Sequence, residues 1–242
     1  MDRFFLSPDS WTPDELQLGG EEGHHAVRVM RKKTGDRVEV FDGAGRWARG
    51  EVREVQRAEL TILVDEAGMS EPLKPQLHLA VAIPKGKTMD LVVQKAVELG
   101  VNGIQPLTTR HTVVKVSAEE AVEKSRKWQR VALEACKQCG QNFLPEVKTV
   151  KPLGMFLREV KTGASLVASL APGALPVREK LEAVPGNCEA LTFLVGPEGD
   201  FAKEEIEEAL AQGFEPVSLG EIVLRVETAC LFLASSARYR FG

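Results

Sequence analysis

The fold is decided near the end of the chain, where Leu191-Thr192-Phe193-Leu194-Val195 runs into Gly196-Pro197-Glu198-Gly199-Asp200-Phe201. The first five residues are an apolar run typical of a buried strand, and the charged pattern from Ala202 to Leu210 predicts a helix. A strand that ends at Gly-Pro-x-Gly and turns into a helix exposes backbone N–H groups at the carboxyl end of a sheet, where open α/β sheets bind ligands. The stretch therefore predicts a binding loop.

A second glycine-containing segment follows, Ser218-Leu219-Gly220-Glu221-Ile222-Val223-Leu224-Arg225-Val226-Glu227-Thr228-Ala229. It repeats the pattern, with an apolar strand, a glycine, and then an arginine and a glutamate two residues apart that the apolar context predicts to be buried. Two such loops at the edge of one sheet predict a pocket built from backbone, with Arg225 and Glu227 as its chemical side chains.

Strands and helices alternate from Gln76 onward. Strands are predicted at 77–83, 103–107, 165–170, 191–195 and 216–219, and further helices at 90–99, 118–139 and 227–239. Alternation of this kind predicts an α/β fold in which helices flank a mostly parallel sheet.

Residues 1–70 differ, because their apolar residues alternate in short runs. Strands are predicted at Arg37–Phe41, Trp47–Val52 and Leu60–Val64, with one short helix over His24–Met30. Closely spaced short strands predict a small β-barrel. We therefore expect a barrel domain over 1–70, a proline-containing linker over 71–75, and the α/β domain over 76–242.

The composition is that of a soluble globular protein, with 242 residues, 43% hydrophobic, and a net charge of −4. We see neither a signal-peptide pattern nor an apolar stretch of the roughly 18 residues that a membrane span needs, and so expect a cytoplasmic protein without membrane contact. Residues 24–57 carry nine Lys/Arg against five Asp/Glu, and residues 85–151 carry twelve against seven. These basic regions are typical of a polyanion-binding surface, although ordinary solvated charge has the same pattern.

Several common chemistries are excluded by spacing. Gly86-Lys87-Thr88 resembles the end of a phosphate-binding loop, but Val81 stands where that loop needs a glycine. The Gly-x-x-Gly at 196–199 lacks the spacing of a dinucleotide site. The single pair Cys136 and Cys139 supplies too few zinc ligands and lies in a predicted helix, so we expect ordinary helix residues and no metal.

Motifs along nearly the whole chain carry a resemblance to one family. They are Arg3-Phe4-Phe5, His24–Arg31, Thr34-Gly35-Asp36, Phe41-Asp42-Gly43, Gln94–Val101, Gln138-Cys139-Gly140, Gly196–Gly199 and Leu219–Ala229. With these motifs the chain resembles the ribosomal RNA small subunit methyltransferase E family, the uracil-N3 enzymes of the knotted SPOUT superfamily. Two positions depart from the family pattern, since Asp200 commonly is glycine and Gln141 commonly is arginine.

The resemblance implies a PUA-like N-terminal barrel and a C-terminal trefoil knot, which is rare among folds. It implies S-adenosylmethionine as methyl donor and a homodimer with its site near the subunit interface. It also implies a uridine of small-subunit ribosomal RNA as substrate, which we expect within an assembled subunit although free RNA is the alternative.

The cofactor is cationic at sulfur and its adenosine is mostly apolar, so a backbone-lined, leucine-rich pocket suits it. The residues expected around it lie in the glycine-containing loops and at neighbouring strand ends: Leu170, Leu194, Val195, Gly196, Pro197, Glu198, Gly199, Ser218, Leu219, Gly220, Ile222, Leu224, Thr228 and Ala229.

Uracil N3 keeps its proton at neutral pH, so an enzyme must help to remove that proton or stabilise the anion that develops on O2 or O4. We expect the Arg225 guanidinium to donate to a uracil carbonyl or a neighbouring phosphate. Glu227 would orient Arg225 or act as base. For both residues the alternative is a buried structural ion pair.

Basic residues of both domains are candidates for contacts with RNA phosphates. They are Arg3, His24, Arg28, Arg31, Lys32, Lys85 and Arg110. Two other functions stay open: a noncatalytic RNA-binding or ribosome-assembly protein, and a knotted methyltransferase that acts on transfer RNA or on a ribose hydroxyl.

Overall fold

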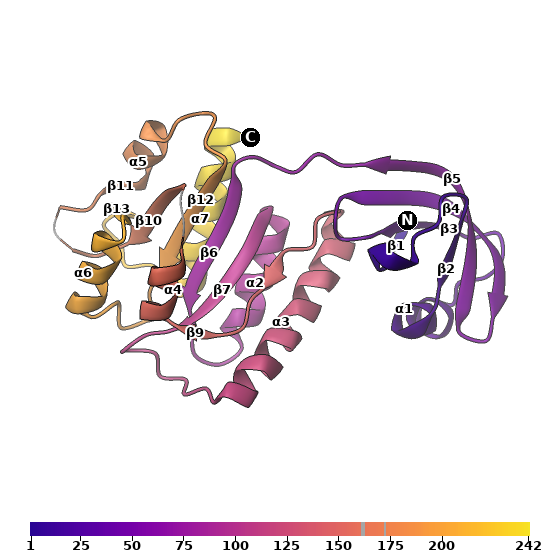
Figure 1. The fold of residues 1–242 in the computed structure, drawn as a ribbon, viewed down its shortest axis with the longest axis horizontal. Helices are drawn as coiled ribbons and strands as arrows, with labels where there is room; N and C mark the ends of the chain where they lie inside the picture. Colours follow the sequence, from indigo (N-terminus) through magenta and orange to yellow (C-terminus); the bar gives the residue numbers. More distant parts are fainter. Residues whose placement is uncertain (161–162, 172) are drawn as a thin grey trace. The chain divides into compact units, whose positions relative to one another are not determined.

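The computed structural model describes residues 1–160, 163–171 and 173–242. The chain forms two compact units (Figure 1). The first unit holds residues 1–72 and 133–144, and the second holds 73–132 and 145–242. The chain passes from the first unit to the second inside the stretch that we expected as a linker. The return of residues 133–144 to the first unit has no signal in the sequence.

The first unit is a five-stranded sheet in the order β1-β3-β4-β5-β2. Its strands are β1 (Asp2–Phe5), β2 (Glu15–Leu18), β3 (Arg37–Phe41), β4 (Arg46–Gln56) and β5 (Glu59–Met69). β1 pairs in parallel with β3, and the other neighbours are antiparallel. Alternate residues such as Val38 and Val40 point to one face, and this face forms the core of the unit.

The short helix of the first unit starts earlier than predicted. Helix α1 covers Gly20–His24, and a π-helical turn covers His25–Val29, so the prediction of one helix over His24–Met30 is wrong in its bounds. A Cβ atom on Gly23 would lie 2.3 Å from the Ala58 carbonyl oxygen. The glycine therefore lets α1 pack directly against backbone.

The second unit is built on an eight-stranded sheet in which every recorded pair is parallel. The strand order is β11-β13-β10-β12-β6-β7-β8, and β9 also pairs with β7. The strands are β6 (Gln76–Ala82), β7 (Val101–Thr108), β8 (Glu146–Val147), β9 (Lys151–Pro152), β10 (Ala164–Ala168), β11 (Leu175–Pro176), β12 (Ala190–Val195) and β13 (Glu215–Ser218).

Helices lie on both faces of this sheet, with α4 and α6 on one face and α2 and α7 on the other (Figure 1). The helices are α2 (Thr88–Glu98), α3 (Ala118–Cys139), α4 (Leu153–Glu159), α5 (Val177–Ala183), α6 (Lys203–Ala211) and α7 (Val226–Phe241). The prediction of an α/β fold with a mostly parallel, helix-flanked sheet is confirmed. Within the described ranges, none of the helices is both long and apolar enough to cross a bilayer.

The core under α4 and α6 forms near the carboxyl ends of the central strands. Ala80, Leu107 and Leu194 pack there against Phe156 of α4 and Ala209 of α6. The strand ends just beyond this core are fixed in position by it, so the loops that follow β10, β12 and β13 start from a rigid edge.

Candidate functional site

Three loops meet at the carboxyl edge of the second unit because β13, β10 and β12 are adjacent and parallel. Together with the start of α7 they line a shallow cavity of about 80 Å³. The lining residues are Ala168, Ser169, Leu170, Val195, Gly196, Pro197, Glu198, Asp200, Leu219, Gly220, Ile222, Val223, Leu224, Val226 and Ala229. The two glycine-containing segments of the sequence thus come together.

Ten of the fourteen residues expected around a cofactor line this cavity: Leu170, Val195, Gly196, Pro197, Glu198, Leu219, Gly220, Ile222, Leu224 and Ala229. The other four lie elsewhere. Leu194 is buried in the core beneath, and Thr228 is exposed on α7. Ser218 ends β13 and its hydroxyl accepts a hydrogen bond from the Gly220 N–H at 3.3 Å. The carbonyl oxygen of Gly199 accepts a hydrogen bond from His111 in a neighbouring loop.

The cavity also contains residues that the sequence did not single out: Ala168, Ser169, Asp200, Val223 and Val226. Ser169 is buried, and its hydroxyl accepts from the Ala171 N–H at 3.1 Å. We predicted a strand over 165–170, but β10 ends at Ala168. A polar residue directly after a parallel strand is the signal that could have found Ser169.

Backbone conformation explains several residue choices in these loops. Gly220 has φ of +119°, which residues with a Cβ rarely adopt. A Cβ on Gly196 would lie 3.0 Å from the Phe201 ring. Asp200 has φ of +58°, a left-handed conformation that aspartate tolerates. Its carboxylate accepts from the Phe201 N–H at 2.8 Å, so the loop accommodates aspartate where the family commonly has glycine.

The Gly-Pro-Glu-Gly loop is held by its two neighbouring loops. Glu198 Oε1 accepts from the backbone N–H of Lys85, which begins the turn between β6 and α2, at 3.0 Å. On the other side, His111 Nδ1 donates to the carbonyl oxygens of Gly199 and Asp200 at 3.1 and 3.0 Å. These contacts fix the loop before any ligand arrives, which lowers the entropy that binding has to remove.

Arg225 and Glu227 flank Val226, which lines the cavity. Arg225 precedes α7 with extended backbone and is exposed, so the expectation that it is buried is wrong; Glu227 is half-buried in the first turn. Neither side chain forms a hydrogen bond or ion pair with the residues that the structure describes. Both are therefore available to a ligand.

The two buried thiols are poor nucleophiles. Burial raises the pKa of Cys230 on α7, and the charge of Glu227 raises it further. Burial likewise raises the pKa of Cys136 to about 12. In the described part of the chain, no three His, Cys, Asp or Glu side chains gather as a metal site would require.

Two of the seven basic residues expected to contact RNA are engaged inside the first unit. The Arg3 guanidinium donates to Glu39 at 2.7 Å, to the Cys136 carbonyl at 2.6 Å and to the Asn142 side chain. Lys32 pairs with Asp2 at 2.5 Å, and its side chain is only 13% exposed. Arg3 thereby anchors the returning segment 133–144 to β1 instead of presenting its charge to solvent.

The other five expected basic residues are exposed: His24, Arg28, Arg31, Lys85 and Arg110. Arg110 pairs with Glu204 at 2.9 Å, but both side chains are more than 60% exposed. A pair of this kind is worth about 0–1 kcal/mol and can exchange for a phosphate. Gln141, the second departure from the family pattern, bonds locally, since its Oε1 accepts from the Phe143 N–H at 3.2 Å.

Comparison with known proteins gives both parts of the chain a counterpart. An RNA methyltransferase domain model matches residues 71–238, and an RNA methyltransferase PUA domain model matches 18–65. Two curated relatives are named ribosomal RNA small subunit methyltransferase E. The relative from Synechocystis is 31% identical over 94% of this chain and 74% of its own length. The relative from Bacillus subtilis is 28% identical over 99% of this chain and 97% of its own length.

Solved structures give the same result. A methyltransferase of Legionella pneumophila in complex with S-adenosylmethionine (SAM) superposes with a TM-score of 0.88, at 32% identity, over 98% of this chain and 96% of that one. A ribosomal RNA small subunit methyltransferase E of Neisseria gonorrhoeae is also bound to SAM. It superposes with a TM-score of 0.87 at 26% identity, over 99% of this chain and 97% of that one.

Proposed function

The chain belongs to the ribosomal RNA small subunit methyltransferase E family, and we propose that it transfers a methyl group from SAM to N3 of one uridine in small-subunit ribosomal RNA. The observation that carries the proposal is the cavity at the carboxyl ends of β10, β12 and β13, beside Arg225, whose side chain bonds to none of the described residues. The names of relatives that match nearly the whole chain support the substrate class.

The lining of this cavity fits the donor. Leu170, Leu219 and Ile222 offer apolar surface for an adenosine, and the backbone of Gly196 and Gly220 can approach a ligand closely because neither has a side chain. Asp200 is a carboxylate in the lining, which suits a cationic ligand. When bound, SAM supplies an electrophilic methyl carbon on a positively charged sulfur.

The residues of the chain would supply positioning and electrostatics. The Arg225 N–H groups would donate to a uracil carbonyl and stabilise the negative charge that develops there as the N3 proton leaves. Glu227, two residues away and also unpaired among the described residues, would accept that proton or orient Arg225. We propose these roles because both side chains flank a cavity residue and neither bonds to a residue that the structure describes.

Exposed basic residues would hold the RNA. We retain His24, Arg28 and Arg31 in the first unit, and Lys85 and Arg110 in the second, as candidate phosphate contacts. Arg3 and Lys32 are not retained, because their charges are engaged internally. The target uridine has to be unstacked or flipped, since N3 lies on the pairing edge of the base.

We also propose that the protein is a homodimer. The cavity of about 80 Å³ is small against the roughly 300–1,000 Å³ of typical ligand pockets. Its apolar rim stays open to solvent, with Leu170, Ile222 and Val223 between 61% and 79% exposed. A second copy that covers this rim would complete the site. The trefoil knot, the barrel closure of the PUA domain and a cytoplasmic location belong to the same proposal.

The test is transfer of labelled methyl from SAM to small subunits that lack the modification, with free ribosomal RNA in parallel, followed by mass spectrometry of the nucleosides. We expect 3-methyluridine, formed on the assembled subunit. SAM binding without transfer to either RNA would favour the noncatalytic binding protein. A methylated ribose, or transfer to transfer RNA alone, would favour the other class of knotted methyltransferase.

A further inference from the structure

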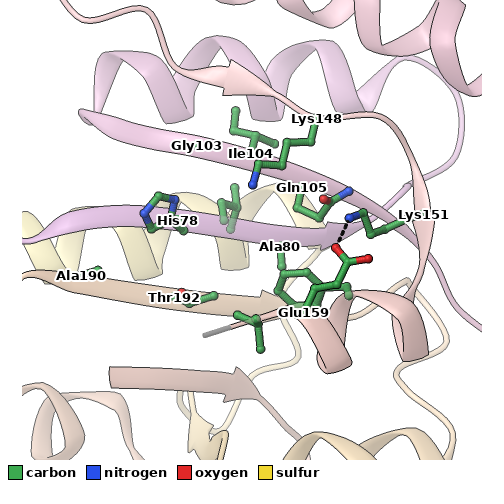
Figure 2. Close-up of a pocket in the computed structure, with 13 residues that line it drawn as sticks. His78, Ala80, Gly103, Ile104, Gln105, Lys148, Lys151, Glu159, Ala190 and Thr192 are labelled. Carbon is green, nitrogen blue, oxygen red and sulfur yellow. Dashed lines mark hydrogen bonds and ion pairs between the residues drawn. The ribbon is translucent and has the colours of Figure 1, made fainter. Parts of the chain in front are cut away.

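A second cavity, of about 380 Å³, lies on the face of the second unit's sheet that α4 covers. Figure 2 shows its side chains along β6, β7 and β12, next to the segment that includes β9 and α4. It is distinct from the loop-lined cavity, because it opens on a face of the sheet and not at its carboxyl edge, and the two share no lining residue.

Strand register places the polar side chains of this cavity together. Thr192 is paired with His78, and His78 with Gly103, across three adjacent strands. In the next row Ala80 is paired with Gln105. Paired residues point to the same face of a sheet, so small residues here leave space beside polar ones. A Cβ on Gly103 would lie 2.9 Å from His78 Nδ1.

Two polar side chains, from residues that are largely buried, face this space. Gln105 and Thr192 are each only 6% exposed. The Gln105 amide nitrogen donates to the carbonyls of Pro106 and Thr149, both at 2.9 Å, which fixes the amide and leaves Oε1 as an acceptor that bonds to none of the described residues. The Thr192 hydroxyl bonds to no described residue. Among the described residues, no fully buried side-chain nitrogen or oxygen lacks a partner, so both oxygens reach the open space of the cavity, where they are accessible to a ligand.

The charges around the cavity favour an anion. Lys151 is neutralised by Glu159 at 2.5 Å, whereas the Lys148 ammonium pairs with no acidic group among the described residues. Burial lowers the pKa of His78, and the charge of Lys148 lowers it further. His78 is therefore neutral at pH 7 and offers one donor and one acceptor. Lys148 is the uncompensated charge of the lining.

We propose that this cavity binds a small organic anion of mononucleotide size. Its anionic group lies against Lys148 and His78, and its neutral hydrogen-bonding part meets Gln105 Oε1 and the Thr192 hydroxyl, with the Phe156 ring as an apolar wall. The cavity volume is within the range of ligand pockets, roughly 300–1,000 Å³. This site does not depend on the methyl-transfer proposal.

Calorimetric titration with uridine 5′-monophosphate tests the site, with S-adenosylhomocysteine present at saturation so that the loop-lined cavity is occupied. We expect uridine monophosphate to bind, and uridine and inorganic phosphate each to bind at least tenfold more weakly. Lys148→Met should weaken binding of the monophosphate about tenfold and leave the affinity for uridine unchanged. Thr192→Val, which keeps the side-chain shape, should weaken the binding of both uridine monophosphate and uridine several-fold.

Lys115→Met is the matched control, since Lys115 is an exposed lysine of the same unit that does not line the cavity. Thermal unfolding checks that each variant is folded. Failure of uridine monophosphate to bind at millimolar concentration would overturn the proposal. Equal affinity for monophosphate and uridine, or an equal loss in Lys115→Met and Lys148→Met, would overturn it too.

Discussion

The two cavities of the second unit are built by different means, although they share the strands of one sheet. Loops line the cavity at the carboxyl edge, and its properties come from backbone: glycines, a left-handed aspartate and hydrogen bonds between loops. Strands line the cavity on the sheet face, and its properties come from side chains that register places in rows. Changes in loop backbone should therefore affect only the first cavity, and truncation of a strand side chain that faces α4 only the second.

The largest effect is expected at Arg225, because we propose that its side chain donates to the charge that develops during methyl transfer. Arg225→Ala should lower kcat/KM for methyl transfer by about 10²–10³-fold, the usual result of removing one donor to developing charge. The SAM dissociation constant should stay within twofold. Arg225→Lys keeps the positive charge but lacks the planar set of donors of a guanidinium, so it should retain only part of the wild-type rate. Normal turnover in Arg225→Ala would remove Arg225 from the mechanism.

Backbone strain introduced at Gly220 should affect ligand binding at the loop-lined cavity and not at the strand-lined one. Gly220→Ala forces a Cβ on φ of +119° and should cost about 1–3 kcal/mol in loop conformation. We expect SAM to bind about tenfold more weakly, with uridine monophosphate binding unchanged. Gly213→Ala is the control, because Gly213 also has positive φ, at +86°, and open space around it, yet lines neither cavity. Weaker SAM binding in both variants would mean that strain acts through global stability.

Loss of the hydrogen bond that fixes the Gly-Pro-Glu-Gly loop should have a smaller effect on SAM binding. Glu198→Ala removes the acceptor for the Lys85 N–H, and a hydrogen bond of this kind contributes about 0.5–1.5 kcal/mol. The SAM dissociation constant should rise between twofold and tenfold. Glu198→Gln keeps an acceptor oxygen and should stay near wild type. If both variants lose affinity equally, the charge of Glu198 matters and not its contact with Lys85.

The smallest effect concerns the strand-lined cavity and pH. Because the pKa of His78 is lowered in the folded protein from 6.5, the unfolded chain binds a proton first as the pH falls. The corresponding stability is present above pH 6.5 and is lost as the pH decreases below that value. His78→Gln should flatten the dependence of urea unfolding between pH 7.5 and 5.5.

The loop-lined cavity could be predicted because its signals are local. A strand, a glycine-rich turn and a helix follow one another in the sequence around Gly196, and parallel strands then bring their carboxyl ends to one edge. Helix α3 carries enough periodicity that its predicted bounds, 118–139, match the structure. The short elements β8, β9 and β11, with two residues each, carry no periodicity and were missed, as were the seven-residue helices α4 and α5.

Side-chain partners that are distant in sequence could not be predicted. Arg3 has the charge of an RNA contact, but its acceptor, the Cys136 carbonyl, lies 133 residues away and comes from a segment that returns to the first unit. The strand-lined cavity depends in the same way on the register of β6, β7 and β12. A shift by one residue would turn Thr192 and His78 to the opposite face.

The contact between His111 and the Gly-Pro-Glu-Gly loop also decides the tautomer of that imidazole. Carbonyl oxygens only accept hydrogen bonds, so the proton of the neutral ring lies on Nδ1, which faces Gly199 and Asp200. Nε2 then keeps its lone pair, on a residue that is exposed. Towards an incoming ligand, the neutral His111 ring is therefore an acceptor for an amino or hydroxyl group, and it cannot donate to an anionic oxygen through Nε2.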